Sequence, residues 1–329
     1  MMDFDRLFDS FKELRVAVIG DVMLDTYWWG KVDRISPEAP VPIVAVSKRE
    51  ERIGGAGNVA LNVQALGATV SVITVVGKDA EADLLVNLFK NNHINTDYVV
   101  SSEGRITTNK IRIIGRNQQM MRLDAEIVDP LNVTDEQALL ASFENYITKE
   151  KPSIVILEDY NKGVLSETAI EKIITLCRAN NILTAVDPKR KNFFSYKQVD
   201  IFKPNLQEAK EGLNLLADAV TPALMEGIHK ALHERLHHSI SLITLSEKGV
   251  FYQHGNQHKI IPTHIRSIAD VSGAGDTVIA VASVVYASTK DVGLMAEISN
   301  IAGGLVCEEV GTVAIDRQKL LEECKHLLG

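Results

Sequence analysis

The sequence predicts an α/β protein whose main body is a doubly wound, mainly parallel sheet flanked by helices, with a small β-sheet lid. Short apolar runs that fit buried strands alternate with helical patterns, most regularly from residue 153 onward. Two stretches, residues 27–46 and 98–128, break this alternation and have the pattern of extended chain. We therefore expect a single domain over residues 1–329, with the lid formed by about residues 25–47 and 97–128.

Bulk composition excludes several classes of protein. The longest apolar run, Val278 to Tyr286, is too short to span a membrane, and residues 1–15 lack the layout of a signal peptide. The net charge of −8 argues against a nucleic-acid partner, because phosphate backbones bind basic faces. The three cysteines are widely spaced, which indicates reduced thiols in a cytoplasmic protein rather than disulfides or a zinc site.

The first predicted strand, Val16 to Gly20, leads into two aspartates, Asp21 and Asp25. Ligands of open α/β sheets bind outside the carboxyl ends of the strands, so Asp25 can accept hydrogen bonds from sugar hydroxyls. A solvated loop acid explains it equally well. Glycines at residues 54, 55 and 57 precede Asn58 and a predicted helix over 59–66. They permit close approach of the backbone to a ligand, and Asn58 offers a donor and an acceptor to a polyol.

The predicted lid is rich in proline and basic residues. Prolines at 37, 40 and 42 favour an edge strand around residues 41–46, and residues 107–114 and 120–127 are predicted to pair through a turn at 115–117. Its basic residues indicate either an anionic group on the substrate or charge that blunts an exposed strand edge. Trp28 and Trp29 are predicted to pack beneath this sheet or at a subunit contact, with ligand stacking as the alternative. The basic residues are Lys110, Arg112, Arg116 and Arg122.

The remaining elements follow the βα rhythm. Strands are predicted at residues 70–76, 153–157, 182–186, 201–203 and 242–245, helices at 80–91 and 168–180, and a hairpin from 250–252 and 259–261. Histidines 229, 233, 237 and 238 are placed on a helix. We interpret it as a surface helix, with a metal site as the alternative.

One stretch near the C-terminus carries the strongest functional signal. Residues 270–277 read Asp-Val-Ser-Gly-Ala-Gly-Asp-Thr and open an apolar helix over 278–287. Gly273 and Gly275 let the backbone turn tightly, and the helix directs its positive N-terminus to the same point, so the turn can hold an anion. Asp276 would repel a bound phosphate unless it takes a proton from the hydroxyl that attacks phosphorus. The alternative is an N-cap aspartate after a glycine turn.

These features together resemble the ribokinase-type (PfkB) sugar kinases over nearly the whole chain, which implies a ribokinase-like fold. Further motifs resemble the branch of this family that acts on D-glycero-β-D-manno-heptose 7-phosphate. Three positions depart from the usual pattern: Gly57 replaces a familiar alanine, Lys203 a common threonine, and Leu245 a frequent arginine. The motifs of the branch are residues 20–25, 34–42, 116–119 with 122–124, 159–160 with 162–163, and 187–189.

The resemblance implies transfer of a phosphoryl group from ATP to the 1-hydroxyl of the heptose 7-phosphate. In this scheme Asp276 is the base, Gly273, Ala274 and Gly275 surround the transferring group, and Glu208 holds Mg²⁺ through water. The implied nucleotide site comprises Asn205, Leu206, Gln207, Glu208, Ser246, Lys248, Gly249, Asn300 and Gly303. The implied sugar phosphate site comprises Asp25, Gly55, Asn58, Lys110, Arg112, Arg116, Asp159 and Lys189.

The expected partners are ATP, Mg²⁺ and a sugar phosphate, together with a second copy of the chain, because paired lids would hide Trp28 and the edge strands. In many bacteria the kinase of this branch is fused to an adenylyltransferase. The chain ends at Gly329 without a His-x-Gly-His signature, so we expect that second activity on another polypeptide.

Three alternatives remain open for the function. They are another PfkB kinase with a different sugar or sugar phosphate, a Rossmann oxidoreductase, and a non-catalytic sugar-binding protein. The first strand is not followed by Gly-x-Gly-x-x-Gly, which argues against the oxidoreductase. Retention of Asp276 and the whole anion turn argues against the sugar-binding protein.

Overall fold

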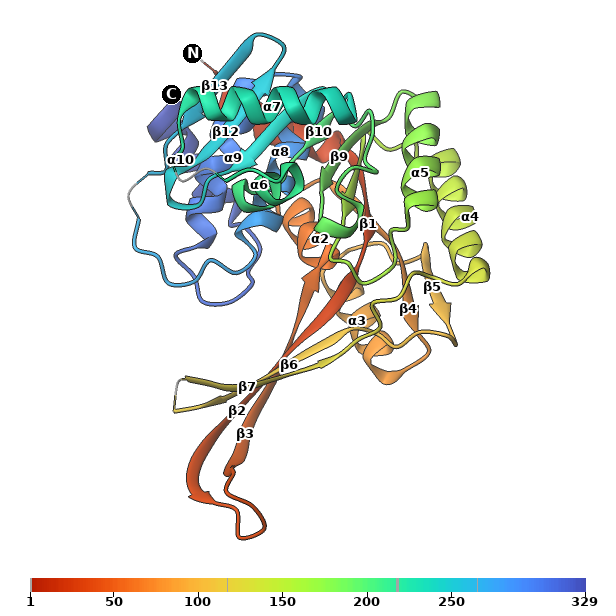
Figure 1. Cartoon of the computed structure of the whole chain (residues 1–329), viewed down its shortest axis with the longest axis vertical. Helices are drawn as coiled ribbons and strands as arrows, with labels where there is room; N and C mark the ends of the chain where they lie inside the picture. Colours follow the sequence, from red (N-terminus) through yellow and green to blue (C-terminus); the bar gives the residue numbers. More distant parts are fainter. Residues whose placement is uncertain (1, 117, 217–218, 265) are drawn as a thin grey trace.

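Two sheets organise the computed structural model, which describes residues 2–116, 118–216, 219–264 and 266–329 (Figure 1). Within these residues, the large sheet has the strand order β13-β12-β11-β10-β9-β8-β1-β4-β5. Its strands are parallel except for the antiparallel hairpin β12–β13 at one edge. The predicted doubly wound, mainly parallel sheet is confirmed. The strands are β1 (Arg15–Gly20), β4 (Thr69–Gly77), β5 (Val99–Ser102), β8 (Ile154–Glu158), β9 (Leu183–Asp187), β10 (Ile201–Phe202), β11 (Ile240–Thr244), β12 (Val250–His254) and β13 (Gln257–Ile261).

Both faces of this sheet are covered, and residues 16–19 of β1 show why an inner strand carries a continuous apolar run. Val16 and Val18 pack into one buried cluster, whereas Ala17 and Ile19 pack into a second cluster on the opposite face. Successive side chains of a strand point to opposite faces, so a strand between two helical layers needs a continuous apolar run.

Helices α1, α2, α3, α8, α9 and α10 supply the first cluster, and α4, α5, α6 and α7 supply the second. Short polar side chains begin several of them: Asp79 caps α3, Ser166 caps α5, and Asn205 with Glu208 forms a capping box at α6. The bounds are α1 (Phe4–Ser10), α2 (Ala56–Ala65), α3 (Ala80–Asn91), α4 (Val133–Glu150), α5 (Glu167–Ala179), α6 (Leu206–Leu213), α7 (Pro222–Leu236), α8 (Ala274–Thr289), α9 (Val292–Val306) and α10 (Arg317–Leu328). The 3-10 turns are Phe11–Glu13, Arg190–Asn192 and Ser246–Lys248.

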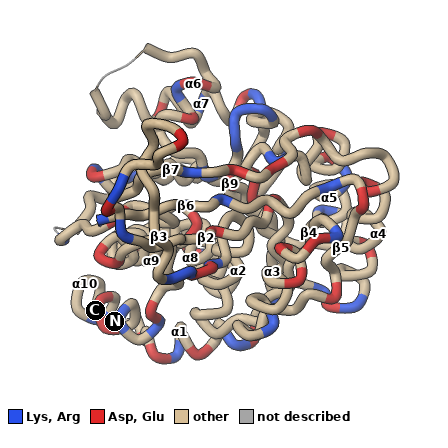
Figure 2. The backbone as a smooth tube through the Cα atoms, turned by 90° about the horizontal axis from the view of Figure 1, so that it is seen from below, with Lys and Arg blue, Asp and Glu red and all other residues tan. Residues whose placement is uncertain are grey.

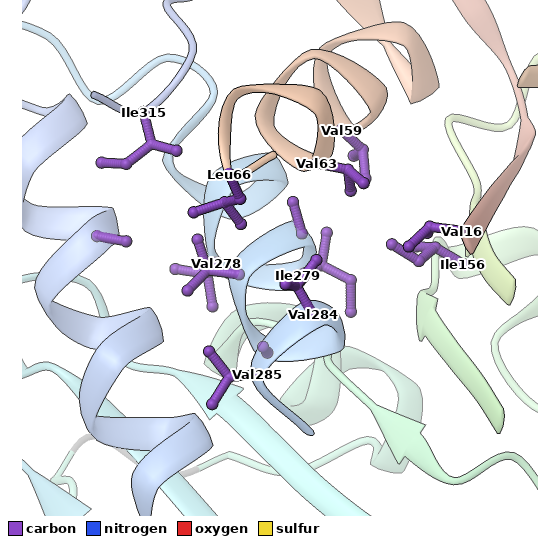
Figure 3. Packing of buried hydrophobic residues seen from close by; sticks show 14 of the residues in the cluster. Val16, Val59, Val63, Leu66, Ile156, Val278, Ile279, Val284, Val285 and Ile315 are labelled. Carbon is purple, nitrogen blue, oxygen red and sulfur yellow. The ribbon is translucent and has the colours of Figure 1, made fainter. Parts of the chain in front are cut away.

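Helix α8 supplies many members of the first cluster, which explains the apolar run from Val278 to Ala282 and the pair Val284 and Val285. Figure 3 shows Val278, Ile279 and Val285 of α8 among side chains of α2, β1 and β8. Ile279 and Val285 are fully buried, and each such side chain contributes about 1.5–3 kcal/mol to stability. The turn at the start of α8 is therefore fixed to a helix whose side chains are buried in the core.

The second sheet has the order β3-β2-β6-β7 and projects away from the body (Figure 1). Its members are β2 (Val22–Ile35), β3 (Pro42–Gly55), β6 (Asn109–Gly115) and β7 (Gln118–Ala125). The predicted pairing of the two later strands is present, although Asn117 of their predicted turn lies outside the described residues. We refer to these four strands as the lid.

The lid differs from its predicted bounds because both long strands reach the main body. Strand β2 begins at Val22 and β3 ends only at Gly55, directly before α2. Within the stretch predicted as 97–128, Val99–Ser102 instead forms β5 at the edge of the large sheet. Trp28 and Trp29 lie on β2, where the Arg49 guanidinium lies 4.9 Å from the Trp28 ring centroid and Tyr27 stacks with Trp29.

The histidine-rich segment is only partly a surface helix. Helix α7 ends at Leu236, His237 is its left-handed cap, and His238 lies beyond it. His229 and His238 are buried, and both hydrogen-bond the Ser241 hydroxyl. Burial lowers the pKa of His229 to about 4 and that of His238 to about 3, so both stay neutral at physiological pH.

Charges of both signs are interspersed along the backbone in the view of Figure 2. Across the described ranges, no helix combines the length and apolarity needed to cross a membrane.

Candidate active site

The anion turn sits at the N-terminus of α8, where the sequence placed it. Gly273 is the N-cap residue with φ +78°, a left-handed conformation that favours glycine. A β-carbon there would lie 2.8 Å from Asn58 Nδ2, so the position also requires the space that glycine leaves. Asp276 follows in the first turn of the helix, and the turn therefore brings a carboxylate and the first N–H groups of the helix to one point.

Asp276 is 4% exposed, and each of its carboxylate oxygens accepts one hydrogen bond. Asn58 Nδ2 donates to Oδ2 and the Tyr160 hydroxyl donates to Oδ1, both at 2.7 Å. Burial raises the pKa of Asp276 to about 6, against the lowering effect of these two donors. A carboxylate with a pKa near 6 is ionised at neutral pH and still basic enough to accept a proton, as a general base must.

Two more carboxylates lie beside Asp276, at the carboxyl ends of adjacent strands. Glu158 ends β8 and Asp187 ends β9, and oxygens of these two residues and Asp276 lie within 4.8 Å of one another. Burial, together with the charges of Asp187 and Asp276, raises the pKa of Glu158 well above its usual range.

Two lysines supply positive charge to this cluster. Lys203 Nζ lies 2.7 Å from Asp187 Oδ2 and is almost fully buried, and Lys189 Nζ bridges Asp187 and Glu208. Burial opposes the charge of Asp187, but the two ammonium groups outweigh it and lower the pKa of that carboxyl group. A β-carbon on Gly275 would lie 3.7 Å from Lys203 Nζ, so this ammonium stands directly beside the anion turn.

A cavity of about 940 Å³ opens over the turn, Tyr160, the two lysines and Asp187. This volume falls in the usual size range of small-molecule sites and is large enough for a nucleotide. Every residue predicted for the turn and for the nucleotide lines it: Gly273, Ala274, Gly275, Asp276, Asn205, Leu206, Gln207, Glu208, Ser246, Lys248, Gly249, Asn300 and Gly303. Lys189, predicted for the sugar phosphate, lines the same cavity.

The residues that would hold Mg²⁺ suit an indirect role. Glu208 Oε2 accepts from the Asn205 N–H at 2.8 Å, and Glu208 Oε1 accepts from Lys189 Nζ at 2.8 Å. Each oxygen keeps a second lone pair, and Glu208 lines the cavity. Mg²⁺ retains several waters in protein sites, so a carboxylate already engaged in this way fits a contact through water.

On the sugar side, Asn58 contacts Asp276, and Asp25 lies on strand β2 of the lid. Asn58 is fully buried, and its Oδ1 has no hydrogen-bond partner within the part of the chain that the structure describes. Its amide therefore holds Asp276 with one end and offers a free acceptor with the other. Gly55 adopts φ +60° as the N-cap of α2, the helix that carries Asn58.

Lys110 and Arg112 are two residues apart on β6 and so share one face of the lid. On the neighbouring strand β2, Asp25 pairs with Lys110 and Tyr27 pairs with Arg112. Arg112 forms an ion pair with Asp25. No carboxylate in the described ranges lies within ion-pair distance of Lys110 Nζ, and burial with the nearby charge of Lys162 lowers the pKa of Lys110.

Two predicted sugar residues lie apart from the others. The Asp159 carboxylate accepts from Tyr196, Asn192 and the Asn161 N–H, and it does not line the cavity. Arg116 is exposed beyond the end of β6 and donates to the Val32 carbonyl. Five residues of strand separate the level of Lys110 from that of Gly115, which amounts to about 17 Å.

Sequence reasoning assigned no chemical role to Tyr160, Glu158, Asp187 or Lys203, although all lie at this centre. The available signal was position: each stands at or just after the carboxyl end of a predicted strand. In a parallel sheet these ends share one edge, where ligands bind.

Comparisons with known proteins agree with this geometry. The model of the "pfkB family carbohydrate kinase" matches residues 13–319. The chain is 38% identical over 313 residues to the bifunctional protein HldE of Aliarcobacter butzleri, covering 94% of this chain and 64% of that protein. It is 39% identical over 314 residues to the protein of the same name from Methylobacillus flagellatus, covering 94% of this chain and 62% of that protein. The chain thus spans less than two thirds of the length of these relatives.

Solved structures share the fold at lower identity. Phosphofructokinase-2 from Escherichia coli, in complex with substrates and products, aligns with a TM-score of 0.78 at 15% identity, covering 96% of this chain and 99% of that one. Ribokinase from Arabidopsis thaliana, complexed with ribose and ATP, aligns with a TM-score of 0.73 at 16% identity, covering 94% and 99%.

Proposed function

The chain belongs to the pfkB family of carbohydrate kinases, and from this premise we propose that it phosphorylates D-glycero-β-D-manno-heptose 7-phosphate. In the proposed reaction the γ-phosphoryl group of ATP passes to the 1-hydroxyl, giving heptose 1,7-bisphosphate for ADP-heptose and lipopolysaccharide core synthesis. The observation that carries the kinase chemistry is Asp276, a buried base at the mouth of an anion turn in a nucleotide-sized cavity.

Asp276 accepts the proton of the sugar hydroxyl as the oxygen attacks the γ-phosphorus. The new O–P bond forms while the bond to the β-phosphate oxygen breaks, and ADP leaves with that electron pair. Negative charge on the transferring group is met by the N–H groups at the start of α8 and by Lys203, whose ammonium is held at the turn by Asp187. Lys203 thus supplies a buried cation where threonine is common among related kinases.

The nucleotide phosphates are assigned to Asn205, Glu208 and Lys189, and the rest of ATP to Ser246, Lys248, Gly249, Asn300 and Gly303. Glu208 would hold Mg²⁺ through water, and the ion would supply positive charge that offsets the charge of the phosphates. Lys189 is fixed between Asp187 and Glu208, so it links the phosphate end of this site to the base.

The sugar is assigned to the space between Asp276 and the lid. Asn58 Oδ1 accepts a hydrogen bond from one sugar hydroxyl, and the Asp25 carboxylate accepts one from another. Gly55 lets the backbone approach the sugar. Lys110 binds the 7-phosphate together with Arg112, because Lys110 is half-buried and carries a charge that no described carboxylate pairs. Asp159 acts indirectly, by holding the loop that carries Tyr160.

We also propose a homodimer that joins two lids. Met121 and Leu123 on β7 are 55% and 43% exposed, and a second lid would cover such side chains along with the strand edge. Light scattering at micromolar concentration tests this, and a monomer would contradict it.

A substrate panel with ADP release as the readout tests the sugar assignment. We expect heptose 7-phosphate to give the highest kcat/KM, with fructose 6-phosphate and unphosphorylated sugars far lower. Comparable or higher efficiency with fructose 6-phosphate would assign the chain to a different carbohydrate kinase of the same family. No turnover with any sugar, with intact ATP binding, would favour a sugar-binding protein.

A further inference from the structure

The Asp276 carboxylate is held from two sides by donors on different elements. Asn58 reaches it from α2, and the Tyr160 hydroxyl reaches it from the loop after β8. Each bond is 2.7 Å long and uses a separate oxygen. The orientation of the base is therefore determined jointly by a residue on the sugar side and by a residue that lines the nucleotide cavity.

Tyr160 is itself fixed by its backbone. Its N–H donates to Asp21 Oδ2 at 2.8 Å, and the same buried carboxylate accepts the N–H groups of Lys162 and Val164, each at 3.0 Å. Lys189 Nζ lies 5.6 Å from the ring centroid. These contacts hold the phenol ring in one place, and its hydroxyl is aimed at Oδ1 of the base.

Toward Asp276 the hydroxyl serves as a donor. Burial and the charge of Asp276 raise the pKa of Tyr160 well above its usual range, so the phenol stays protonated. A carboxylate oxygen has two lone pairs, and Tyr160 occupies one of those on Oδ1. The other remains for the proton of the attacking sugar hydroxyl.

We propose that Tyr160 is a positioning residue, which orients the Asp276 carboxylate through its hydroxyl and keeps that carboxylate ionised in its buried site. The proposal rests on the proposed function, because it assigns Asp276 as the base. It differs from a packing role, because the hydroxyl rather than the ring carries the effect.

The charged and titratable groups around Asp276 determine the direction of the effect. Glu158 on β8 and Asp187 on β9 face it, as do Lys203 after β10 and Lys189 beside the Tyr160 ring. Burial and Asp187 raise the pKa of Asp276, whereas Asn58, Tyr160 and Lys203 lower it. Removal of the Tyr160 hydroxyl takes away one of these lowering contacts, so the pKa must rise.

The decisive variant is Tyr160→Phe, which keeps the ring and removes only the hydroxyl. The matched control is Tyr98→Phe, because the Tyr98 hydroxyl also faces a carboxylate, Glu150, at 3.4 Å and lies outside the cavity lining. The first readout is kcat from pH 5 to pH 9. We expect the acid limb of Tyr160→Phe to move to higher pH, with kcat about tenfold lower near pH 6 and within about threefold near pH 8.5. Tyr98→Phe should retain the wild-type profile.

The second readout needs no substrate and so separates this inference from the sugar assignment. The enzyme is labelled with carbon-13 at the side-chain carboxyl carbon of aspartate and titrated by NMR without ligands. The Asp276 signal is assigned by its loss in Asp276→Asn. We expect its titration midpoint to rise in Tyr160→Phe. A failed sugar panel leaves this measurement intact. A midpoint and an acid limb that both coincide with wild type would overturn the inference.

A merely structural role would lower kcat equally at every pH and leave the midpoint unchanged. Thermal melting of both phenylalanine variants checks the fold. Should Tyr160→Phe not be recovered as folded protein, Tyr160→Met replaces it, because methionine keeps apolar volume without a hydroxyl.

Discussion

The nucleotide side and the sugar side of the site were both predicted from sequence motifs, yet they are built differently. On the nucleotide side, every assigned residue lines one cavity. On the sugar side, Lys110 and Arg112 share a lid face, Arg116 lies beyond Gly115, whose level is about 17 Å from that of Lys110, and Asp159 is turned into the loop interior. Side chains at the ends of parallel strands converge because topology brings them to one edge. Side chains on a long hairpin converge only if the register and the face agree.

Loss of the base should have the largest effect and would break the comparison at its shared centre. Asp276→Asn keeps the shape of the side chain and removes its ability to accept a proton. We expect kcat to fall about 10²–10⁴-fold while ATP still binds, as measured by turnover and by nucleotide titration. Asp316→Asn, at the cap of α10, is the matched control and should turn over normally. Near-normal kcat in Asp276→Asn would refute the assignment.

The next largest effect tests whether the nucleotide side depends on a buried cation. Lys203→Met keeps the length of the side chain and removes the ammonium from the anion turn. We expect kcat to fall about 10²–10³-fold, the usual effect of losing one group that stabilises a transferring anion. Single-turnover kinetics separates this loss from nucleotide binding. A kcat within threefold of wild type would leave Lys203 with only a charge-balancing role toward Asp187.

A paired substitution tests the sugar side directly. Lys110→Ala should raise KM for the sugar phosphate about ten- to hundredfold, with KM for ATP changed far less, because a charged hydrogen bond contributes about 1.5–3 kcal/mol. Arg116→Ala should change neither KM more than about twofold if the sugar contacts residues of one chain only. Equal effects on the two substrates in Lys110→Ala would move that residue off the phosphate. A large effect of Arg116→Ala would place it at a sugar site of a second copy.

The smallest expected effect is the pH dependence of kcat, which tests Asp276, the residue that the nucleotide side and the sugar side share. Asp276 has to be deprotonated to act, and its pKa is raised to about 6, so kcat should fall as the pH is lowered through that value. At one pH unit below it, about one tenth of the enzyme carries the ionised base. A pH profile of kcat with saturating substrates checks this. A flat profile down to pH 5 would show that proton removal by Asp276 does not limit turnover.

Local signals predicted many elements well, and α3 and α8 show why. Helix α3 occupies Ala80–Asn91 as expected, because Asp79 caps it and its apolar side chains recur at helical spacing. Helix α8 was expected from its apolar run after a glycine turn. Helix α4 had an equally readable signal, the Asn132 cap followed by Leu139, Phe143 and Tyr146, and was overlooked.

The remaining residues depend on contacts between segments far apart in the chain. Tyr160 meets Asp276 across 116 residues, and no local pattern identifies that pair. Asp159 and Tyr160 are adjacent but differ in direction, since one side chain faces the loop interior and the other lines the cavity. Lys203 was visible only as a departure from a familiar threonine. Its ion pair with Asp187 depends on the pairing of β9 with β10.

The lid has almost no slack where it joins the body. A single residue, Asp21, separates β1 from β2, and no residue separates the end of β3 at Gly55 from the start of α2 at Ala56. Because these connections are so short, we expect a tilt of the outer end of the lid to change the backbone at Asp21 or to displace the first turn of α2. That turn carries Asn58, and the Asp21 side chain anchors the backbone of Tyr160. The two donors to Asp276 are therefore attached at the two points where the lid joins the body. Hydrogen exchange of residues 56–60 should therefore slow if binding of a sugar phosphate tilts the lid, and unchanged exchange there would show that sugar binding at the lid is not coupled to the first turn of α2.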